Sequence, residues 1–179
     1  MNYKETNNED PIKKTGKSML YFAWILAFML FYIFFQGKTN EQHNPNAKPT
    51  SQIENQQIKV FLQRNRAGHY VSSGSINGHP VQFLIDTGAS NIAIPENIAN
   101  ELGLKKGYLQ TVSTANGNIN VWNTNVQNLQ IGDIRLTGLN ASINPGQNHS
   151  QEILLGMSAL KRLDFEQQGQ QLILIQNLN

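Results

Sequence analysis

Hydrophobic residues follow two different patterns along this chain, one continuous and one interrupted. The continuous pattern is a run of 17 residues without a charge, Met19–Phe35, dominated by Leu, Phe, Ile, Ala and Met. As a helix with a rise of 1.5 Å per residue, the run is about 26 Å long, close to the roughly 30 Å of a bilayer's hydrocarbon core. Tyr21, Trp24 and Tyr32 are suited to the membrane interfaces. We therefore predict a transmembrane anchor over residues 19–36.

A secretory signal peptide is the alternative interpretation of this run. The run exceeds the usual apolar region of about 7–15 residues, and no small-x-small cleavage pattern follows it, which favours an uncleaved anchor. Lysines are denser before the run (Lys4, Lys13, Lys14, Lys17) than in the stretch just after it (Lys38, Lys48). The positive-inside rule then predicts that the tail, 1–18, is cytoplasmic and that the rest of the chain is extracytoplasmic.

The interrupted pattern begins after a polar segment. Residues 37–56 contain Asn, Gln, Pro, Lys and Thr with almost no apolar residue, so they cannot bury enough surface to offset their ordering entropy. We predict a disordered polar linker there. From Ile58 onward, short apolar segments alternate with glycine and polar turns, which is typical of an all-β domain. We expect a small all-β barrel over 57–179, with one or two short helices.

Local turn signals predict several elements of this domain. Two hairpins are expected where Asn-Gly separates two apolar segments, because this dipeptide readily takes positive φ at both turn positions. They comprise Tyr70–Ile76 with Val81–Ile85, and Leu109–Ala115 with Ile119–Val126. A helix is predicted over 96–102, with Pro95 opening it and Gly103 ending it. Further short strands are expected at Leu129–Ile131, Ile134–Leu136, Leu139–Ile143 and Leu172–Ile175.

Composition narrows the chemistry. The net charge is +2 and the Lys and Arg residues are scattered, so no basic stripe predicts a nucleic-acid partner. Cysteine is absent, which excludes disulfides, thiol catalysis and zinc–thiolate sites. The four histidines show no paired metal spacing, and no serine lies in a nucleophile elbow. We therefore expect neither a metal nor another cofactor.

The strongest candidate site is the segment Val81–Ser90, where an apolar strand ends in Asp86-Thr87-Gly88-Ala89. A carboxylate held by hydrogen bonds at the end of a buried strand can share a proton with a facing carboxylate. By itself, Asp-x-Gly also fits an ordinary turn between strands. Context comes from a second apolar strand that ends in glycine, Ile153–Gly156, followed by a helix-like segment, Ser158–Leu163.

These two motifs, in this order and spacing, resemble those of the bacterial, membrane-anchored branch of the retropepsin-like (clan AA) aspartic proteases. The resemblance covers roughly His69–Ile175 and implies a closed acid-protease barrel in which Asp86 is catalytic. It implies supporting roles beside the aspartate for Thr87, Gly88, Ala89, Leu155 and Gly156. It also implies a Gram-negative cell, with the anchor in the inner (cytoplasmic) membrane and the protease domain in the periplasm.

The second predicted hairpin occupies the position of the flap in this family. The resemblance implies that its tip, Ala115, Asn116 and Gly117, opens to admit a peptide and closes over it. A plain surface hairpin fits the same residues.

Aspartic proteolysis needs two carboxylates, whereas this chain has one Asp-Thr-Gly. Asp10, Asp133 and Asp164 lack the Thr-Gly turn, so a homodimer is expected to bring Asp86 opposite Asp86. By resemblance, the terminal strands Ile58–Leu62 and Leu172–Ile175 pair with those of the partner. Retroviral members brace the dimer with an arginine and a polar residue after the second glycine, where this chain has Met157-Ser158. The strength of the dimer is therefore not carried over from them.

The expected function is a membrane-anchored aspartic endopeptidase that acts on extended peptides. One Asp86 carboxylate would take a proton from water while the other, protonated, polarises the scissile carbonyl. The alternative is a membrane-tethered peptide-binding or assembly module that keeps the fold without cleaving. The intact Asp86-Thr87-Gly88 favours the protease, because binding alone does not need a pair of carboxylates.

Overall fold

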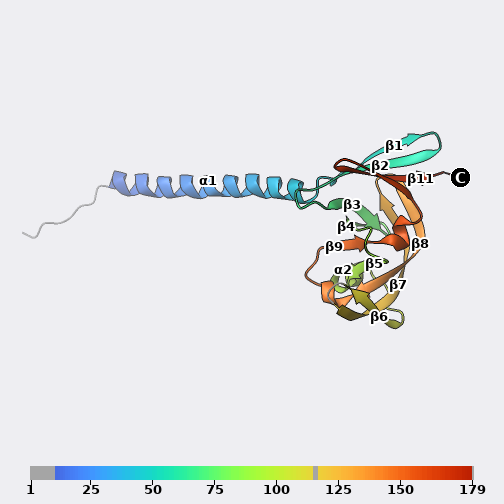
Figure 1. The fold of residues 1–179 in the computed structure, drawn as a ribbon. Coiled ribbons are helices and arrows are strands. Elements are labelled where there is room, and N and C mark those ends of the chain that lie inside the picture. The colour runs from blue at the N-terminus through green and yellow to red at the C-terminus, as the bar shows by residue number, and fades with distance from the viewer. Residues whose placement is uncertain (1–10, 115–116, 179) are drawn as a thin grey trace, which may run out of the picture. The chain divides into compact units, whose positions relative to one another are not determined.

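The computed structural model describes residues 11–114 and 117–178 (Figure 1). The chain divides into two units, Met1–Asn40 and Glu41–Asn179. Helix α1 (Pro11–His43) contains the predicted anchor, and an 18-residue window within its portion Met19–His43 has a mean hydropathy of 1.9. That portion is long and apolar enough to cross a membrane, a property that signal sequences share. Its large apolar side chains from Met19 to Phe35 are exposed.

The second unit is built around a sheet that closes on itself. Because β3 also pairs with β7, at Ser75 with Gln130 and Ile76 with Leu129, the sheet forms a barrel. The all-β barrel predicted from the strand pattern is therefore confirmed. Its strand order is β3 (Tyr70–Ile76), β4 (His79–Ile85), β9 (Glu152–Leu155), β5 (Ile92–Pro95), β8 (Ile134–Asn144), β7 (Gly117–Ile131) and β6 (Leu109–Thr114).

A second, four-stranded antiparallel sheet contains both terminal strands of the domain. Its order is β1 (Thr50–Glu54), β2 (Gln57–Gln63), β11 (Gln171–Asn177) and β10 (Asp164–Gln168). The strands predicted at Ile58–Leu62 and Leu172–Ile175 are β2 and β11, and they pair with each other within one chain. Their outer edges are occupied by β1 and β10. Within one chain, β1 and β10 thus cover the edges at which these two strands would pair with a partner subunit, and their predicted role in a dimer interface stays a prediction.

Most of the local turn predictions are confirmed. Asn77 and Gly78 have φ of 50° and 84°, and they join β3 to β4 in an antiparallel hairpin. Helix α2 (Glu96–Glu101) directly follows Pro95, and Gly103, with φ 64°, lies just beyond it. Other segments differ in length from the predictions, because β7 and β8 are each one continuous strand where two were predicted. A 3-10 turn, η1 (Pro145–Gln147), and a short helix, α3 (Met157–Leu160), complete the domain.

The predicted linker, 37–56, is largely ordered. Helix α1 continues to His43, and Thr50–Glu54 forms β1, joined to β2 through Asn55 and Gln56, which both have positive φ. Between them Asn46 is 3% exposed, and its amide nitrogen donates to the carbonyls of Gln63 (2.9 Å) and Val71 (2.7 Å). The prediction of disorder failed because it considered only apolar burial, whereas a buried amide side chain fixes this segment to β2 and β3.

Replacing Asn46 with alanine should therefore destabilise the domain. The Asn46 Oδ1 atom also accepts a hydrogen bond from Gln63 N (2.6 Å), so three hydrogen bonds would be lost at a buried position. We expect the free energy of unfolding to fall by about 1–3 kcal/mol, measured by urea denaturation. Asn118→Ala, at an exposed position on β7, is the control. Equal denaturation midpoints for the two variants would contradict this role of Asn46.

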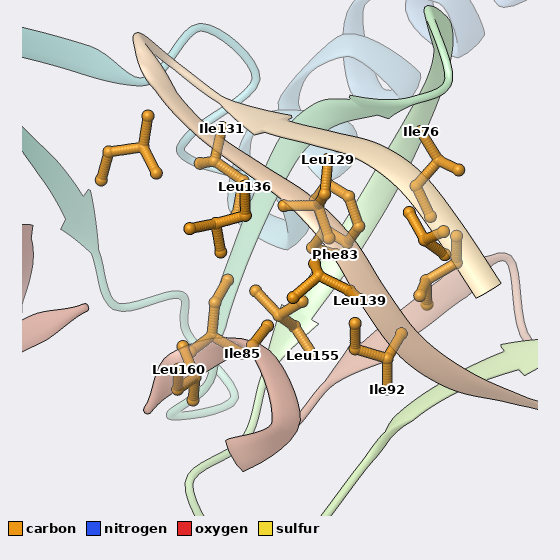
Figure 2. Close-up of a cluster of buried hydrophobic side chains, with 14 of the residues drawn as sticks. Ile76, Phe83, Ile85, Ile92, Leu129, Ile131, Leu136, Leu139, Leu155 and Leu160 are labelled. Atoms are coloured by element: carbon orange, nitrogen blue, oxygen red, sulfur yellow. The ribbon is translucent and has the colours of Figure 1, made fainter. Parts of the chain in front are cut away.

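The barrel encloses one main hydrophobic core. Side chains from β3, β4, β5, β7, β8, β9 and α3 meet in it, and Figure 2 shows Ile85 and Leu155 within this cluster. These two residues end β4 and β9 and are 6% and 0% exposed. The strand ends that precede the candidate site are therefore held by core packing, which resists displacement of the backbone.

Candidate active site

Asp86 lies at the point where two neighbouring parallel strands end. Strands β4 and β9 pair in parallel, with Ile85 opposite Leu155. The backbone N–H of Asp86 donates to the carbonyl of Leu155 at 3.1 Å. The two motifs singled out in the sequence are therefore neighbours in space, and the supporting strand contacts the aspartate directly through the backbone.

The carboxylate of Asp86 is held by the tight turn that follows it. The N–H of Gly88 donates to Asp86 Oδ1 at 2.8 Å, and the N–H of Ala89 donates to the Asp86 carbonyl at 3.3 Å. Asp86 is half-buried, whereas Thr87 and Gly88 are exposed. A Cβ atom on residue 88 would lie only 3.2 Å from Asp86 Oδ1. The turn thus orients one carboxylate while leaving the adjacent residues open to a ligand.

Gly156 allows the two loops of the site to pack against each other. It is buried, and a Cβ atom at this position would lie 2.5 Å from the Asn91 carbonyl oxygen and 2.6 Å from that of Ala89. The N–H of Met157 donates to the Ala89 carbonyl at 2.8 Å. Glycine is therefore required by close backbone approach here, and the predicted supporting residues lie together around Asp86.

Ser158 is a supporting residue that the sequence analysis did not identify. Its hydroxyl accepts a hydrogen bond from the N–H of Ile92 at 3.0 Å and donates to the carbonyl of Asn140 at 3.3 Å. Its own N–H donates to the carbonyl of Ser90 at 2.9 Å. One side chain thus connects α3, β5 and β8 behind the active-site turn. The residues that it contacts are distant in the sequence, so its role could not be predicted from local sequence. The only signal was that Met157-Ser158 differs from the residues of the retroviral proteases at this place.

Pockets flank the turn on two sides, and Thr87 contributes to both. The pocket that contains Asp86 has a volume of about 470 Å³ and is lined by Gly68, His69, Tyr70, Leu84, Ile85, Asp86, Thr87, Phe165, Gln167 and Leu172. The other pocket, about 280 Å³, is lined by residues 87–91, Met157, Ser158 and Lys161. Asp86 is the only carboxylate among these lining residues. A larger pocket, between β4 and α2, includes none of the predicted site residues.

The predicted flap is the hairpin β6–β7, in which Thr114 pairs with Gly117. Ala115 and Asn116 lie outside the described residues. Figure 1 shows this hairpin at the opposite end of the domain from β1 and β2. Near its base, Lys106 Nζ lies 5.7 Å from the centre of the Trp122 ring and forms an ion pair with Glu96. The hydrogen bond from Lys106 lowers the pKa of Glu96, with a smaller effect from Asn148.

The other candidate aspartates do not join Asp86. Asp133 lies in the turn between β7 and β8, and its N–H donates to Ser51 Oγ at 3.0 Å. The Asp164 carboxylate accepts a hydrogen bond from the side chain of Asn177 at 2.9 Å. Asp10 lies outside the described residues. Within the described ranges, no group of three or more His, Cys, Asp or Glu side chains could hold a metal ion.

Comparison with known proteins identifies the family. Residues 72–162 match the family described as "gag-polyprotein putative aspartyl protease". The chain is 34% identical over 114 residues to the "Uncharacterized protein in cobV 5'region" of a Sinorhizobium species, covering 62% of this chain and 48% of that protein. It is 32% identical over 116 residues to an uncharacterized protein of Rickettsia prowazekii (strain Madrid E), covering 58% and 45%. The chain thus spans about half the length of these curated relatives.

A solved structure agrees with this match. The fold is similar to the crystal structure of a retropepsin-like aspartic protease from Rickettsia conorii, with a TM-score of 0.59 and 29% sequence identity. The alignment covers 72% of this chain and 96% of that one. The chain therefore belongs to the gag-polyprotein aspartyl protease family and has the retropepsin-like fold.

Proposed function

We propose that this chain is a membrane-anchored aspartic endopeptidase whose catalytic group is the Asp86 carboxylate, paired with Asp86 of a second copy. The observation that carries the proposal is the position of this carboxylate. It lines a pocket, and the Gly88 N–H fixes one of its oxygens at 2.8 Å. Ordinary turns also contain this hydrogen bond, so the position of the carboxylate in the pocket, beside the end of β9, is what supports a catalytic role.

The proposed reaction is the addition of water to a peptide carbonyl. One Asp86 carboxylate accepts a proton from the water as the oxygen attacks the carbonyl carbon, while the protonated partner carboxyl donates a hydrogen bond to the carbonyl oxygen. The tetrahedral intermediate then expels the amine, which takes up the proton that the first Asp86 carboxylate accepted from the water, so that the pair returns to its starting state. In aspartic proteases two carboxylates share one proton because like charges about 3 Å apart cannot both ionise.

Among the described residues, no second carboxylate lines a pocket with Asp86. Asp133 and Asp164 lie at other places in the domain, and neither lines a pocket with Asp86. Twofold symmetry repeats the same group across an axis, so a homodimer supplies the missing half-site from Asp86 of the partner. Thr87, which is exposed beside Asp86, is proposed to form a hydrogen bond across this axis.

The apolar helix is proposed as an uncleaved membrane anchor. The lysines before Met19 favour a cytoplasmic N-terminus, with the protease domain on the periplasmic side of the inner membrane. Confining subunits to a membrane raises their effective concentration. Anchoring would therefore favour the dimer that the chemistry needs.

The proposed substrate is an extended peptide that binds along the turn at Asp86. Such a peptide forms backbone hydrogen bonds and inserts alternate side chains into pockets. The pockets on either side of Thr87 are suited to that arrangement. The hairpin tip at 115–117 is proposed as the flap that closes over the bound peptide.

Incubation of the full-length protein in detergent with a diverse peptide library, across a range of pH, tests this function. Wild type and Asp133→Asn, which changes an exposed aspartate in a turn, should cleave the same peptides. Asp86→Asn should not cleave them. If the wild type is dimeric but cleaves no peptide at any pH, the non-catalytic peptide-binding module becomes the better description.

A further inference from the structure

The smaller pocket beside the active-site turn contains one charged side chain, that of Lys161. This pocket has a volume of about 280 Å³ and is lined by Thr87, Gly88, Ala89, Ser90, Asn91, Met157, Ser158 and Lys161. No carboxylate is among these residues. Lys161 is exposed, and within residues 11–114 and 117–178 its ammonium group has neither an ion-pair partner nor a hydrogen-bond acceptor. The pocket therefore carries a positive charge that nothing in the described domain neutralises.

The backbone of this pocket adds hydrogen-bond donors. The carbonyl of Ala89 accepts a hydrogen bond from Met157 N–H at 2.8 Å. The carbonyl of Ser90 accepts one from Ser158 N–H at 2.9 Å. By contrast, the N–H groups of Ser90 and Asn91, two exposed residues, donate to no acceptor in the part of the chain that the structure describes. The two carbonyls are occupied while these donors are free, so the pocket is suited to a ligand that only accepts hydrogen bonds, such as a carboxylate.

The size and position of the pocket indicate one side chain of a longer ligand. Sites for whole small molecules have volumes of roughly 300–1,000 Å³, and this pocket is smaller. Met157 is half-buried in it, and a thioether side chain offers an adaptable apolar surface to methylene groups. Thr87 lines both this pocket and the one that contains Asp86. A peptide bound at Asp86 and extended along the turn therefore reaches the pocket within a few residues of the scissile bond.

We propose that Lys161 determines specificity by binding a carboxylate of the peptide substrate close to the scissile bond. The proposal rests on the proposed function, because the peptide held at Asp86 supplies the carboxylate. The methylene groups of a glutamate or aspartate pack against Met157. The carboxylate oxygens accept hydrogen bonds from the Lys161 ammonium and from the free N–H groups of the turn. The substrate class is therefore peptide segments with an acidic residue near the cleaved bond.

The exposure of Lys161 sets the size of the expected effect. An exposed ion pair contributes up to a few-fold in affinity, and hydrogen bonds to a charged group contribute more. We expect kcat/KM of the wild type to be about three- to tenfold higher for a peptide with glutamate at the selected position than for its glutamine twin. Salt screens exposed charges, so this ratio should fall as the ionic strength rises.

Peptide binding tests the site without cleavage. The full-length Asp86→Asn protein in detergent is incubated with a randomised peptide library, beside the same protein carrying Lys161→Gln. Asp and Glu should be enriched by about three- to tenfold among the peptides bound to the first protein and not among those bound to the second. Lys48→Gln is the matched control, because Lys48 is an exposed lysine in a pocket without Asp86 or Thr87. Equal acidic enrichment with and without Lys161, or none in either protein, would overturn the proposal.

An acidic side chain and the C-terminal carboxylate of a peptide present the same chemistry to Lys161. The library is therefore used in two forms, with amidated and with free C-termini. Acidic enrichment in the amidated form assigns the pocket to a side chain. A preference for free C-termini that is independent of side chains and lost in Lys161→Gln assigns it to the terminal carboxylate.

Charge reversal excludes an indirect effect on stability. Lys161→Glu should favour peptides with lysine over those with glutamate, which a loosened fold cannot produce. The Tm should stay unchanged, because the Lys161 ammonium has no partner in the described domain. A variant that retains the wild-type preference for acidic peptides would contradict the role of Lys161.

Cleavage kinetics separate this inference from the proposed function. A wild type that cleaves the glutamate and glutamine twins with equal kcat/KM would refute the specificity and leave the protease intact. Acidic enrichment that depends on Lys161, in a protein whose wild type cleaves no peptide, would support the carboxylate site and refute the protease.

Discussion

Asparagine in place of Asp86 should lower kcat/KM for peptide hydrolysis by about a thousandfold or more, because an amide can neither accept the proton of the attacking water nor donate from a carboxyl. The fold should be unaffected: asparagine has nearly the same size, and its Oδ1 atom can still accept the hydrogen bond from Gly88 N. Steady-state kinetics and thermal unfolding of the same preparation measure both effects. A variant with lost activity and a lowered Tm would show a folding defect instead of a catalytic role.

Mixed dimers extend this prediction to the number of carboxylates required. When wild-type and Asp86→Asn subunits are reconstituted together, only dimers with two aspartates should cleave. At equal amounts of the two and an unchanged total subunit concentration, activity should fall to about one quarter of that of the wild type alone, as random pairing in a twofold dimer requires. Mixing with Asp133→Asn should cause no such loss. A fall to one half would mean that each subunit acts by itself.

The second large effect is expected at Gly156, where alanine should destabilise the domain by about 2–3 kcal/mol and impair cleavage. A methyl group there would meet the backbone oxygens of Asn91 and Ala89 at 2.5 and 2.6 Å. These atoms belong to the loop that follows Asp86, and Ser158 holds this loop to β8. Relief of the clash must therefore displace the segment that orients the catalytic carboxylate.

Thermal or urea denaturation, combined with the cleavage assay, measures this effect. Gly37→Ala is the control, since the added Cβ in α1 would meet no atom within 4 Å beyond its chain neighbours and the helix's own backbone. It should leave the Tm of the β domain unchanged. If Gly156→Ala folds with wild-type stability and cleaves at the wild-type rate, the two loops are not held together as tightly as the distances indicate.

Local sequence was sufficient for much of the fold. Asn77-Gly78 predicted a hairpin because few dipeptides take positive φ at both positions, and the structure has φ of 50° and 84° there. The strand before Asp86 was evident because its apolar residues are contiguous and end at a turn. Both signals act over fewer than about ten residues, within the range over which propensity and patterning operate.

The same local signals failed where hydrogen bonds join distant segments. Asn46 looked like part of a disordered linker, yet its side chain is bonded to residues 17 and 25 positions away. Counting apolar residues cannot detect a segment that is fixed by a buried amide. The supporting role of Ser158 was missed for the same reason, because its hydroxyl bonds to Ile92 and Asn140.

The sequence by itself determined the apolar helix, the β character of the domain and the carboxylate motif at Asp86, because each depends on contiguous residues. Only the tertiary structure decided that β2 pairs with β11 within one chain and that β10 becomes an open edge beside Asp86. Strand partners are chosen by long-range packing and loop closure, which the spacing of residues along the chain does not specify.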